Sequence, residues 1–507
     1  MGRQTPTAFQ NLLSSVILPC LSILLLPITA SAVVVCIAYN KLLNGNDESR
    51  IGDHVKLQKG CVVISGGRMS KGLTLARAFK RAGWKVIGVE EEGWGELCPM
   101  RYSAAIDKFY ILPSASQSYK RYSKKLLSIV ELHSATLFIP VSGAGSSVED
   151  ARAADEMFSA TNGRCRTFIQ DPETMEDLHD KDKFMSLVEK LELRIPSGKM
   201  VNSVEEALAF LKADDQFLEP KYILKCMGLD ENRGDMTLYP LKVDNKELTE
   251  TRKSLESLNL KITKECPYVF QEFIPGQEWC THASVINGQI TSFVACPSND
   301  MLMTYENATT QDIGRMAEGW TKTLLDRLQK DPTPTGKQRN LTGHFSFDFI
   351  VSTKNGEMYP LECNARVHTA VIMLPLSEIA ECYEENHPAN RTILRPPADI
   401  APRSWFYNDL IMRYLPLIVS SPEILAMIHP SLPACSLDPR KKHTIRPSEE
   451  PLKWRKDPTL ISDDWIPFVM LWHVYWPYLL LFRWFNGKKW TRHWSYFRGL
   501  GIGPVKD

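Results

Sequence analysis

The sequence has almost no net charge and lacks the short motifs that mark common metal and nucleotide sites. Its 60 Lys and Arg residues balance 59 Asp and Glu residues, so a net charge of +1 gives no general attraction for nucleic acid, and no nucleic-acid partner is expected. The twelve cysteines form no CxxC pair and no zinc spacing, which favours reduced, structural thiols over a disulfide framework. Neither GxGxxG nor the P-loop pattern GxxxxGK followed by Ser or Thr occurs, and no repeat is present.

An uncharged apolar segment lies close to the N-terminus. No charged residue occurs between Arg3 and Lys41, and residues 12–39 are almost wholly apolar, a length that crosses a bilayer with some tilt. Residues 1–45 are therefore predicted to be a single-pass anchor with an N-terminal transmembrane helix. Because several basic residues follow this segment, the positive-inside rule places the bulk of the chain in the cytosol. The alternative is a cleaved signal peptide, since TASA at residues 29–32 resembles a cleavage site, but the apolar run continues past it.

The next segment alternates strand and helix patterns. GCVVISGG is read as a buried strand that ends in glycines, SKGLTLARAFKRAG as an amphipathic helix, WKVIGVE as a second strand, and ATLFIPVSG as a later one. This order predicts a doubly wound, Rossmann-like domain over residues 58–175. The loop SGGRMSKG matches no nucleotide fingerprint, so a plain turn without a bound nucleotide is the alternative interpretation.

The C-terminal region, residues 386–507, is rich in Trp and Pro. Within it, residues 465–482 are nearly uncharged, but a clean membrane span is disfavoured by Pro467, His473 and Pro477. Abundant aromatic side chains and a basic cluster favour a segment at a membrane interface; the cluster comprises Lys488, Lys489 and Arg492. A hydrophobic strip packed on the rest of the protein is the alternative.

Polar side chains in an apolar hairpin predict a metal site. FDFIVSTKNGEMYPLECNAR, residues 347–366, reads as two strands, with Asp348 in the first and Glu362 and Asn364 on one face of the second. A two-residue turn would put Asp348 on the wrong face. A three-residue loop that ends in a left-handed Gly356 pairs Thr353 with Glu357 and brings all three oxygen donors together. Opposed carboxylates repel, and Mg²⁺ or Mn²⁺ is the simplest remedy; a solvent-facing hairpin is the alternative.

The ordered set of motifs resembles the ATP-grasp superfamily, and more closely the ligases of mycosporine biosynthesis that join glycine to deoxygadusol. The stretches that carry the resemblance are VVISGGRMSKGLTLARAF, DKDKF, YILK, QEFIPGQEWCTH, YEN and FDFI with LECNARVHTA, over roughly residues 60–385. The resemblance implies a mixed α/β and α+β chain, in which a Rossmann-like pre-ATP-grasp domain precedes an ATP-grasp fold. That fold would span residues 176–385, with a lid subdomain at 176–270 and a metal-binding subdomain at 271–385.

The resemblance also implies which residues bind ATP. Lys183 and Lys225, on separate strands, would contact the phosphates as point charges. Gln271 and the backbone of Phe273 would read the adenine edge, and Glu278 would accept hydrogen bonds from the ribose hydroxyls. The phosphate-covering loop of the superfamily is often rich in Gly and Ser, whereas CMGLDENRGDM has two glycines, and Arg233 would replace backbone donors there.

The remaining implied roles concern metal and substrate. Asp348, Glu362 and Asn364 would hold Mg²⁺ or Mn²⁺ between the terminal phosphates, and Arg366 would steady the transferred phosphoryl group or the acid substrate. His282 and His368 would take the proton of the amine, with buried structural histidines as the alternative. Ala365 stands where the superfamily often has Pro, a departure that should change stiffness more than ligation.

The expected function is therefore that of an ATP-dependent C–N ligase in natural-product biosynthesis. ATP would phosphorylate an acid or enol oxygen, and an amino acid or amine would displace phosphate, leaving ADP. The alternatives are ATP-grasp ligation of a different metabolite such as a peptide-type product, a carboxylation, a kinase, or a membrane-tethered ATP-binding scaffold without turnover. The metal trio and Arg366 favour the enzyme over the scaffold.

Overall fold

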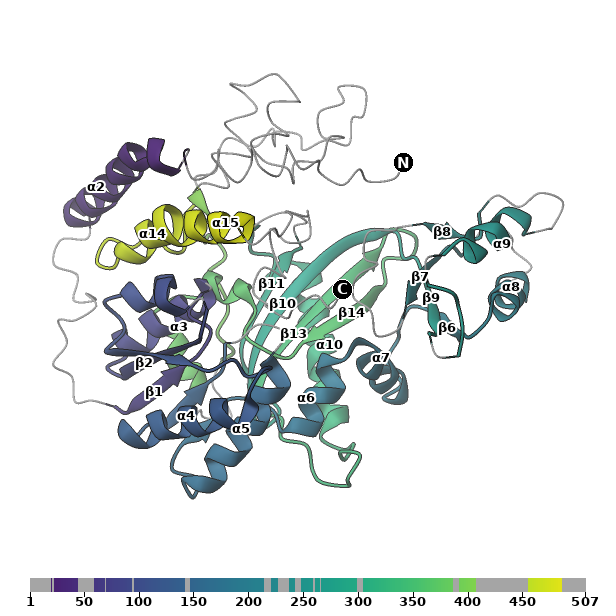
Figure 1. Ribbon diagram of the computed structural model, residues 1–507, viewed down its shortest axis with the longest axis horizontal. Coiled ribbons are helices and arrows are strands. Elements are labelled where there is room, and N and C mark those ends of the chain that lie inside the picture. Colours follow the sequence, from purple (N-terminus) through teal and green to yellow (C-terminus); the bar gives the residue numbers. More distant parts are fainter. Residues whose placement is uncertain are drawn as a thin grey trace. The chain divides into compact units, whose positions relative to one another are not determined.

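The computed structural model describes most of the chain between residues 20 and 485. The described residues are 20, 22–43, 59–68, 70–93, 95–141, 146–213, 220–226, 237–241, 248–258, 260–264, 266–298, 304–385, 392–406 and 455–485. They form two compact units: residues 188–277 and 349–361 make up the smaller, and the other described residues make up the larger. The fold is mixed α/β, as predicted, and it includes a parallel sheet (Figure 1).

The parallel sheet lies in the larger unit and confirms the predicted β-α-β start. Its strand order is β3-β2-β1-β4-β5, and every neighbouring pair is parallel. The strands are β1 (Cys61–Ile64), β2 (Lys85–Glu91), β3 (Lys108–Leu112), β4 (Leu137–Ile139) and β5 (Arg166–Thr167), and the helices between them are α3 (Ser70–Arg81), α4 (Tyr119–Leu132) and α5 (Ser147–Ala160), with short 3₁₀ turns η1 (Gly95–Leu97) and η2 (Pro99–Tyr102). Buried apolar runs such as CVVI in β1 suit strands that are covered on both faces.

The glycine-rich loop after β1 is compact because Gly72 has no side chain. A Cβ atom at Gly72 would lie 2.7 Å from the carbonyl oxygen of Gly66. The first turn of α3 can therefore pack directly against the loop backbone, which fixes the position of the residues at the start of the helix.

The smaller unit contains an antiparallel sheet with the strand order β6-β9-β7-β8. Its strands are β6 (Gly198–Val201), β7 (Tyr222–Cys226), β8 (Leu238–Tyr239) and β9 (Tyr268–Glu272), and its helices are α8 (Val204–Ala213) and α9 (Thr249–Glu256). Ser203 caps α8, because its hydroxyl accepts a hydrogen bond from the Glu206 N–H. Phe270 is fully buried in the core of this unit.

A second four-stranded sheet has the order β11-β10-β13-β14. Its strands are β10 (Gly276–Ile286), β11 (Gln289–Pro297), β13 (Gly343–Ser352) and β14 (Met358–Asn364), and α10 (Asp312–Leu328) packs on β11. A small β12 (Thr304–Tyr305) pairs with β15 (Arg403–Ser404), and the 3₁₀ turns η5 (Thr369–Met373) and η6 (Ile379–Tyr383) follow β14.

The hairpin between β13 and β14 differs from the prediction by one residue. Gly356 has the predicted left-handed conformation, with φ of 70°. However, the Ser352 N–H donates to the Glu357 carbonyl at 2.9 Å, and the Gly356 N–H donates to the Ser352 carbonyl at 2.9 Å, so Ser352 rather than Thr353 lies opposite Glu357. The loop is therefore one residue longer than predicted. Strict alternation also fails in β14, where the buried residues Pro360 and Cys363 are three positions apart.

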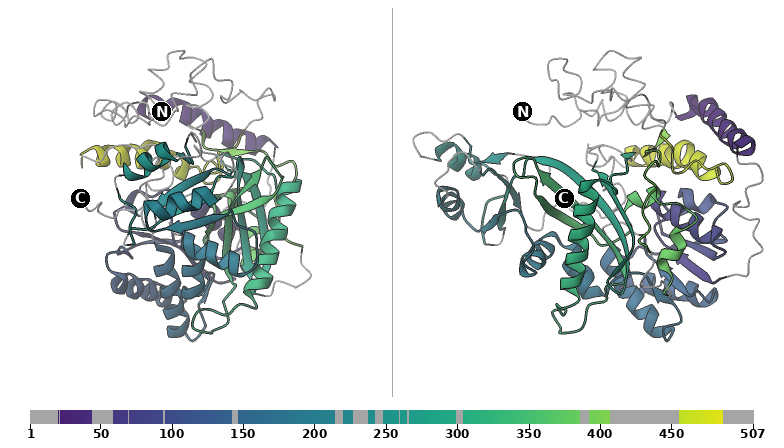
Figure 2. Two further views of the ribbon diagram at one scale, coloured as in Figure 1. Left: turned by 90° about the vertical axis from the view of Figure 1, so that its right-hand side faces the viewer. Right: turned by 180° about the vertical axis from the view of Figure 1, so that it is seen from behind.

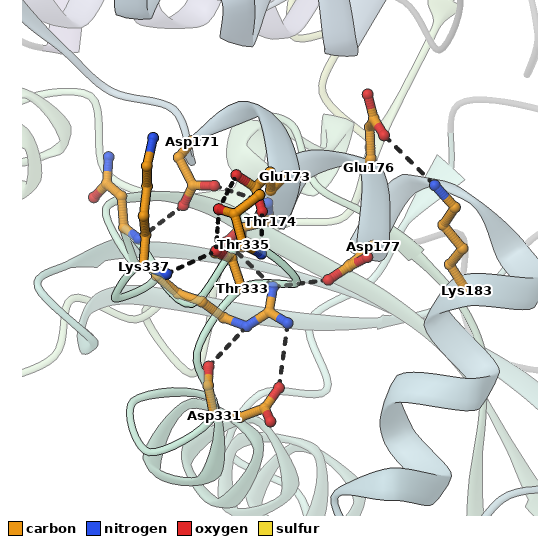
Figure 3. Close-up of polar contacts among 12 residues, drawn as sticks. Asp171, Glu173, Thr174, Glu176, Asp177, Lys183, Asp331, Thr333, Thr335 and Lys337 are labelled. Atoms are coloured by element: carbon orange, nitrogen blue, oxygen red, sulfur yellow. Dashed lines mark hydrogen bonds and ion pairs between the residues drawn. The ribbon is translucent and has the colours of Figure 1, made fainter.

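Two helices, α6 (Pro172–His179) and α7 (Lys181–Lys190), lead away from the parallel sheet. Arg339 holds α6 to the loop after α10: its guanidinium contacts Asp177 at 2.9 Å and Asp331 at 3.2 Å. Figure 3 shows these two carboxylates at the ends of dashed lines from one guanidinium, together with Thr174, which accepts a hydrogen bond from Arg339 at 3.3 Å. The side chain of Arg339 is only 2% exposed. Its ion pairs and hydrogen bonds therefore hold α6, the helix directly before α7, in place.

Arg339→Met is expected to lower the free energy of unfolding of the larger unit by about 3 kcal/mol, because two mostly buried carboxylates lose their partner. Chemical denaturation followed by circular dichroism measures the change. Lys337→Met is the matched control, since Lys337 lies in the same loop and is exposed. Equal stability of the two variants would show that the network contributes little.

The C-terminal part of the larger unit is a nearly continuous helical run. It consists of α14 (Ile466–Met470), a π-helical turn (Leu471–Tyr475) and α15 (Trp476–Phe485). Pro477 lies two positions after the last residue of the π turn, where a residue without an N–H and with a bulky ring is well accommodated in a helix. The predicted basic cluster at 488–492 lies outside the described residues.

The N-terminal segment forms α2 (Leu26–Leu43) in the larger unit. Among the residues that the structure describes, no helix is both long enough and apolar enough to cross a membrane. The predicted transmembrane helix is therefore unsupported, and residues 1–19 of the predicted anchor lie outside the described part of the chain. None of the ten cysteines whose side chains are described forms a disulfide.

Candidate active site

Asp348, Glu362 and Asn364 converge in the larger unit. The Asn364 side-chain amide donates to Asp348 Oδ2 at 3.2 Å. The pKa of Asp348 is raised well above its ordinary value, first because the carboxyl is buried and then because of the negative charge of Glu362, with which it also shares a hydrogen bond. The hairpin thus brings together two carboxyl groups that repel when both are ionised.

The ammonium group of Lys181, at the first position of α7, lies 2.6 Å from Glu362 Oε2. Sequence reasoning missed this residue, although it stands in the DKDKF stretch that was singled out. The predicted residue, Lys183, is on the same helix and not on a strand. Its side chain is half-exposed and points to Glu176 at 3.5 Å, as Figure 3 shows.

The capping of α7 explains this difference between the two lysines. Asp180 precedes the helix, and its carboxylate accepts hydrogen bonds from the backbone N–H groups of Asp182 and Lys183 at 3.0 and 3.1 Å. Side chains two positions apart on a helix lie about 200° apart, so Lys181 and Lys183 cannot face the same site.

Arg366 and Glu278 border the trio. Burial lowers the pKa of the Arg366 guanidinium, and the negative charges of Glu362 and Asp348 oppose this effect. Glu278, at the start of β10, is exposed, and its negative charge adds to the rise in the pKa of Asp348. The predicted ribose ligand is therefore close enough to the trio to contribute to the local field.

The trio fits a hard divalent cation that is completed by other ligands. Two carboxylates and one amide supply oxygen donors, and Mg²⁺ is usually held by one or two carboxylates together with water and phosphate oxygens. Among the described residues, no group of three or more His, Cys, Asp or Glu side chains is placed to hold a metal by itself. The Asn364 amide presents its nitrogen to Asp348, and a half-turn of the amide would present its oxygen to a cation instead.

Cation binding at this site is expected to release a proton. Since the pKa of Asp348 is raised, its carboxyl holds a proton at pH values where an ordinary aspartate would be ionised, and a cation must displace it. The affinity for Mn²⁺ in the presence of ADP should therefore increase with pH over the range in which Asp348 titrates. Titration calorimetry in two buffers of different ionisation enthalpy measures the proton release; identical heats in both buffers would contradict it.

A small cavity lies beside Arg366, at the carboxyl ends of strands β4 and β5. Its lining residues are Pro140, Ser147, Asp150, Phe168, Ile169, His344, Ala365 and Arg366. Asp150 is 1% exposed and accepts a hydrogen bond from the hydroxyl of Tyr122. Carboxyl ends of parallel strands are the usual position of ligands in open α/β sheets. An acid and a guanidinium thus face one space, an arrangement that individual sequence motifs did not reveal.

The two predicted catalytic histidines are deeply buried. Burial, together with the positive charge of Lys71, lowers the pKa of His282 to about 3, and burial lowers the pKa of His368 to about 3. The backbone N–H of His368 donates to His282 Nδ1 at 3.3 Å. Neutral rings with such low pKa values are weak bases, so their assignment as proton acceptors stays a prediction with little geometric support.

Lys71 is a buried cation next to these histidines. Its side chain is 3% exposed, and its ammonium donates to the Val367 carbonyl at 2.6 Å. Burial and the nearby Arg366 lower the pKa of Lys71 well below its ordinary value. Its position at the start of α3, after the glycine-rich loop, is the only sequence signal that could have pointed to it.

Three predicted ATP ligands lie in the smaller unit. Lys225 is in β7 opposite Val269, and Gln271 is in β9 opposite Ile223. The Phe273 N–H donates to the Lys221 carbonyl at 2.7 Å, so it is already used within this unit. Arg233 lies outside the described residues, and the roles of all four stay predictions.

No protein-family model matches the sequence, and no curated protein matches it. Solved structures that are similar to the chain include an ADP complex of N5-carboxyaminoimidazole ribonucleotide synthetase, at 14% identity and a TM-score of 0.45, covering 73% of this chain and 88% of that one. Another is N5-carboxyaminoimidazole synthetase from Staphylococcus aureus with ADP, at 15% identity and a TM-score of 0.42, with 63% and 74% covered. A third is an L-amino acid ligase from Bacillus licheniformis, at 14% identity and a TM-score of 0.39, with 62% and 69% covered. Because these identities and TM-scores are low, the similar structures do not establish the reaction, and it has to be inferred from the side chains of the site.

Proposed function

We propose that this protein is an ATP-dependent C–N ligase of the ATP-grasp type. The observation that carries the proposal is the convergence of Asp348, Glu362 and Asn364, with Lys181 at 2.6 Å from Glu362. Such a set suits a nucleotide-bound cation, because the carboxylates bind the metal and the cationic side chain lies beside it for the phosphates. The order of sequence motifs supports the same class.

The proposed reaction has two steps. The terminal phosphoryl group of ATP is transferred to an oxygen of an acid or enol substrate, which forms an acyl or enol phosphate and releases ADP. The amine nitrogen then attacks the activated carbon, the C–O bond breaks, phosphate leaves with that oxygen, and the nitrogen loses a proton. Bound Mg²⁺ or Mn²⁺ would neutralise charge on the phosphates.

The side chains of the site have complementary tasks. Asp348, Glu362 and the amide of Asn364 would hold the cation. Lys181 and Arg366 would bind phosphate oxygens or the anionic substrate, since both are cations at the edge of the acidic trio.

The finer assignment rests on the sequence resemblance alone. We propose an amino acid such as glycine as the amine and a deoxygadusol-like enol or an acid as its acceptor, in natural-product biosynthesis. The anionic character of such an acceptor is compatible with Arg366 next to the cavity.

The direct test is release of ADP by the full chain with Mg²⁺, a deoxygadusol-like substrate and a panel of amino acids. The proposal predicts ADP release that depends on both substrates and disappears in Glu362→Gln, while the exposed control Glu131→Gln keeps the wild-type rate. ADP release without any amine would indicate a kinase, bicarbonate dependence would indicate a carboxylation, and nucleotide binding without ADP release in any mixture would indicate a scaffold.

Lys181 and Lys183 provide a matched pair for the phosphate site. Lys181→Met is expected to lower kcat/KM for ATP by about 10- to 100-fold, because a charge-assisted contact contributes about 1.5–3 kcal/mol. Lys183→Met removes a half-exposed ammonium from the same helix and should change kcat/KM by less than about threefold. A larger loss of kcat/KM in Lys183→Met than in Lys181→Met would support Lys183 as the phosphate ligand, as predicted from the sequence.

A further inference from the structure

Helix α2 and the C-terminal helical run lie side by side although they are far apart in the sequence (Figures 1 and 2). The Ser22 hydroxyl donates to the Trp472 carbonyl at 2.8 Å, and His473 Nε2 lies 2.7 Å from the Thr29 hydroxyl. Thr29 is fully buried and Val33 is 7% exposed at this contact. One side of α2 is therefore fixed to the π-helical turn by polar contacts.

Both helices also carry apolar side chains that are exposed. On α2 and the residues before it, Leu24 is 74% exposed, Val34 63% and Val35 65%, and on α15, Phe482 is 44% and Phe485 76% exposed. On the inner side of the run, Leu471, Tyr475 and Leu479 are buried in a small cluster with Trp405 and Trp472. The run already has a core contact, so its exposed aromatic residues form a second apolar surface. Several large exposed apolar side chains on two neighbouring helices are uncommon on a freely soluble surface.

The sequence around both helices contains no acidic residue. No Asp or Glu occurs before Asp47, and none occurs from Trp465 to Lys506. The basic residues of these two stretches are Arg3, Lys41, Arg483, Lys488, Lys489, Arg492, Arg498 and Lys506. Apolar segments whose neighbours in the sequence are basic are complementary to an anionic lipid surface, where basic side chains add attraction to the burial of apolar ones.

We propose that the exposed apolar side chains of α2 and α15 dock together on an anionic phospholipid bilayer, with both helices in the plane of the interface. The aromatic rings of Tyr478, Phe482 and Phe485 suit the boundary between headgroups and acyl chains. A second copy of this chain fits less well, because two like-charged surfaces would have to approach each other. This inference is independent of the proposed reaction.

The test uses the full chain and vesicles of phosphatidylcholine with or without phosphatidylserine, in a flotation assay. The wild-type chain is expected to float with the anionic vesicles and to partition several-fold less onto the neutral ones. Phe482→Glu with Phe485→Glu, and separately Val34→Glu with Val35→Glu, should each lower the partition coefficient by at least about tenfold, because a charge opposes burial in the interface. Unchanged circular dichroism shows that each variant is folded.

The matched control is Leu132→Glu with Phe158→Glu, which places the same charges on exposed apolar positions of α4 and α5, 69% and 48% exposed. This pair should partition like the wild type. The proposal would be overturned if the control lost as much vesicle binding as the α2 and α15 variants, or if the wild-type chain did not float with anionic vesicles. A dimer of the chain that dissociates only in the α2 and α15 variants would also overturn it. Protection of an N-terminal tag inside the vesicles against added protease would also overturn it, since the tag would then have crossed the bilayer.

Discussion

Replacing Asp348 by asparagine is expected to lower amine-dependent ADP release by about 100- to 1,000-fold, the size of effect that follows loss of one charge-stabilising group at a reaction centre. The substitution keeps the shape of the side chain and removes one of two carboxylates in the trio. Steady-state ADP release at saturating substrates measures the effect. Asp399→Asn, at an exposed position, is the control and should keep the wild-type rate. A rate for Asp348→Asn within about threefold of the wild type would remove the trio from the mechanism.

The same variant should be at least as stable as the wild type in the absence of metal. The pKa of Asp348 is raised above the ordinary 3.8 in the folded chain, so its ionisation opposes folding as pH increases above that value. The amide cannot ionise and avoids this cost. Thermal unfolding at neutral pH with a chelator tests the expectation; a large loss of stability would indicate that Asp348 has a structural role instead of a metal-binding one.

Replacing Arg77 by methionine is expected to lower the free energy of unfolding of the larger unit by about 3–5 kcal/mol, because it leaves the buried carboxylate of Asp464 without its cation. Arg77 is 0% exposed, and its Nε lies 2.7 Å from Asp464 Oδ2. The guanidinium also donates to the carbonyls of Pro458 and Thr459, each at 3.0 Å. The Ser103 hydroxyl donates to the same carboxylate oxygen at 2.6 Å.

This pair holds the C-terminal segment 455–485 to helix α3, so its loss should also expose that segment to protease. Denaturant unfolding and limited proteolysis measure the two effects. Arg81→Met is the control: Arg81 is on the same helix, is partly exposed and lies 3.5 Å from Asp463, so its loss should cost less than about 1 kcal/mol. Equal effects of the two substitutions would show that the buried network does not anchor the segment.

The strands and helices of the parallel sheet could be predicted because interactions between residues close in the sequence determine them. The run CVVI in β1 is apolar without alternation, and the glycines after it permit the tight passage to α3, so strand, loop and helix follow from adjacent residues. The left-handed turn at Gly356 was predicted for the same reason. In the hairpin, the register was wrong by one residue because a longer loop with the same glycine also closes the turn.

The site could be predicted only in part, because it also depends on where a helix begins and on contacts between residues far apart in the sequence. Asp348, Glu362 and Asn364 lie in one hairpin, so their closeness could be predicted even though strict alternation fails in β14. The choice between Lys181 and Lys183 depends on where α7 begins, which the capping by Asp180 decides. Arg77 and Asp464 are 387 residues apart in the sequence, and no local pattern relates them.

The central claim is that an oxygen of the first substrate is phosphorylated and leaves as phosphate. The measurement is mass spectrometry of inorganic phosphate from turnover of an acid or enol substrate labelled with ¹⁸O at the reacting oxygen, with its amine partner, by the full chain. A ligase of the proposed type places one ¹⁸O atom from the substrate in each phosphate released. Phosphate without the label, formed at the same rate as ADP, would show that water rather than the substrate receives the phosphoryl group, and the proposed reaction would be wrong.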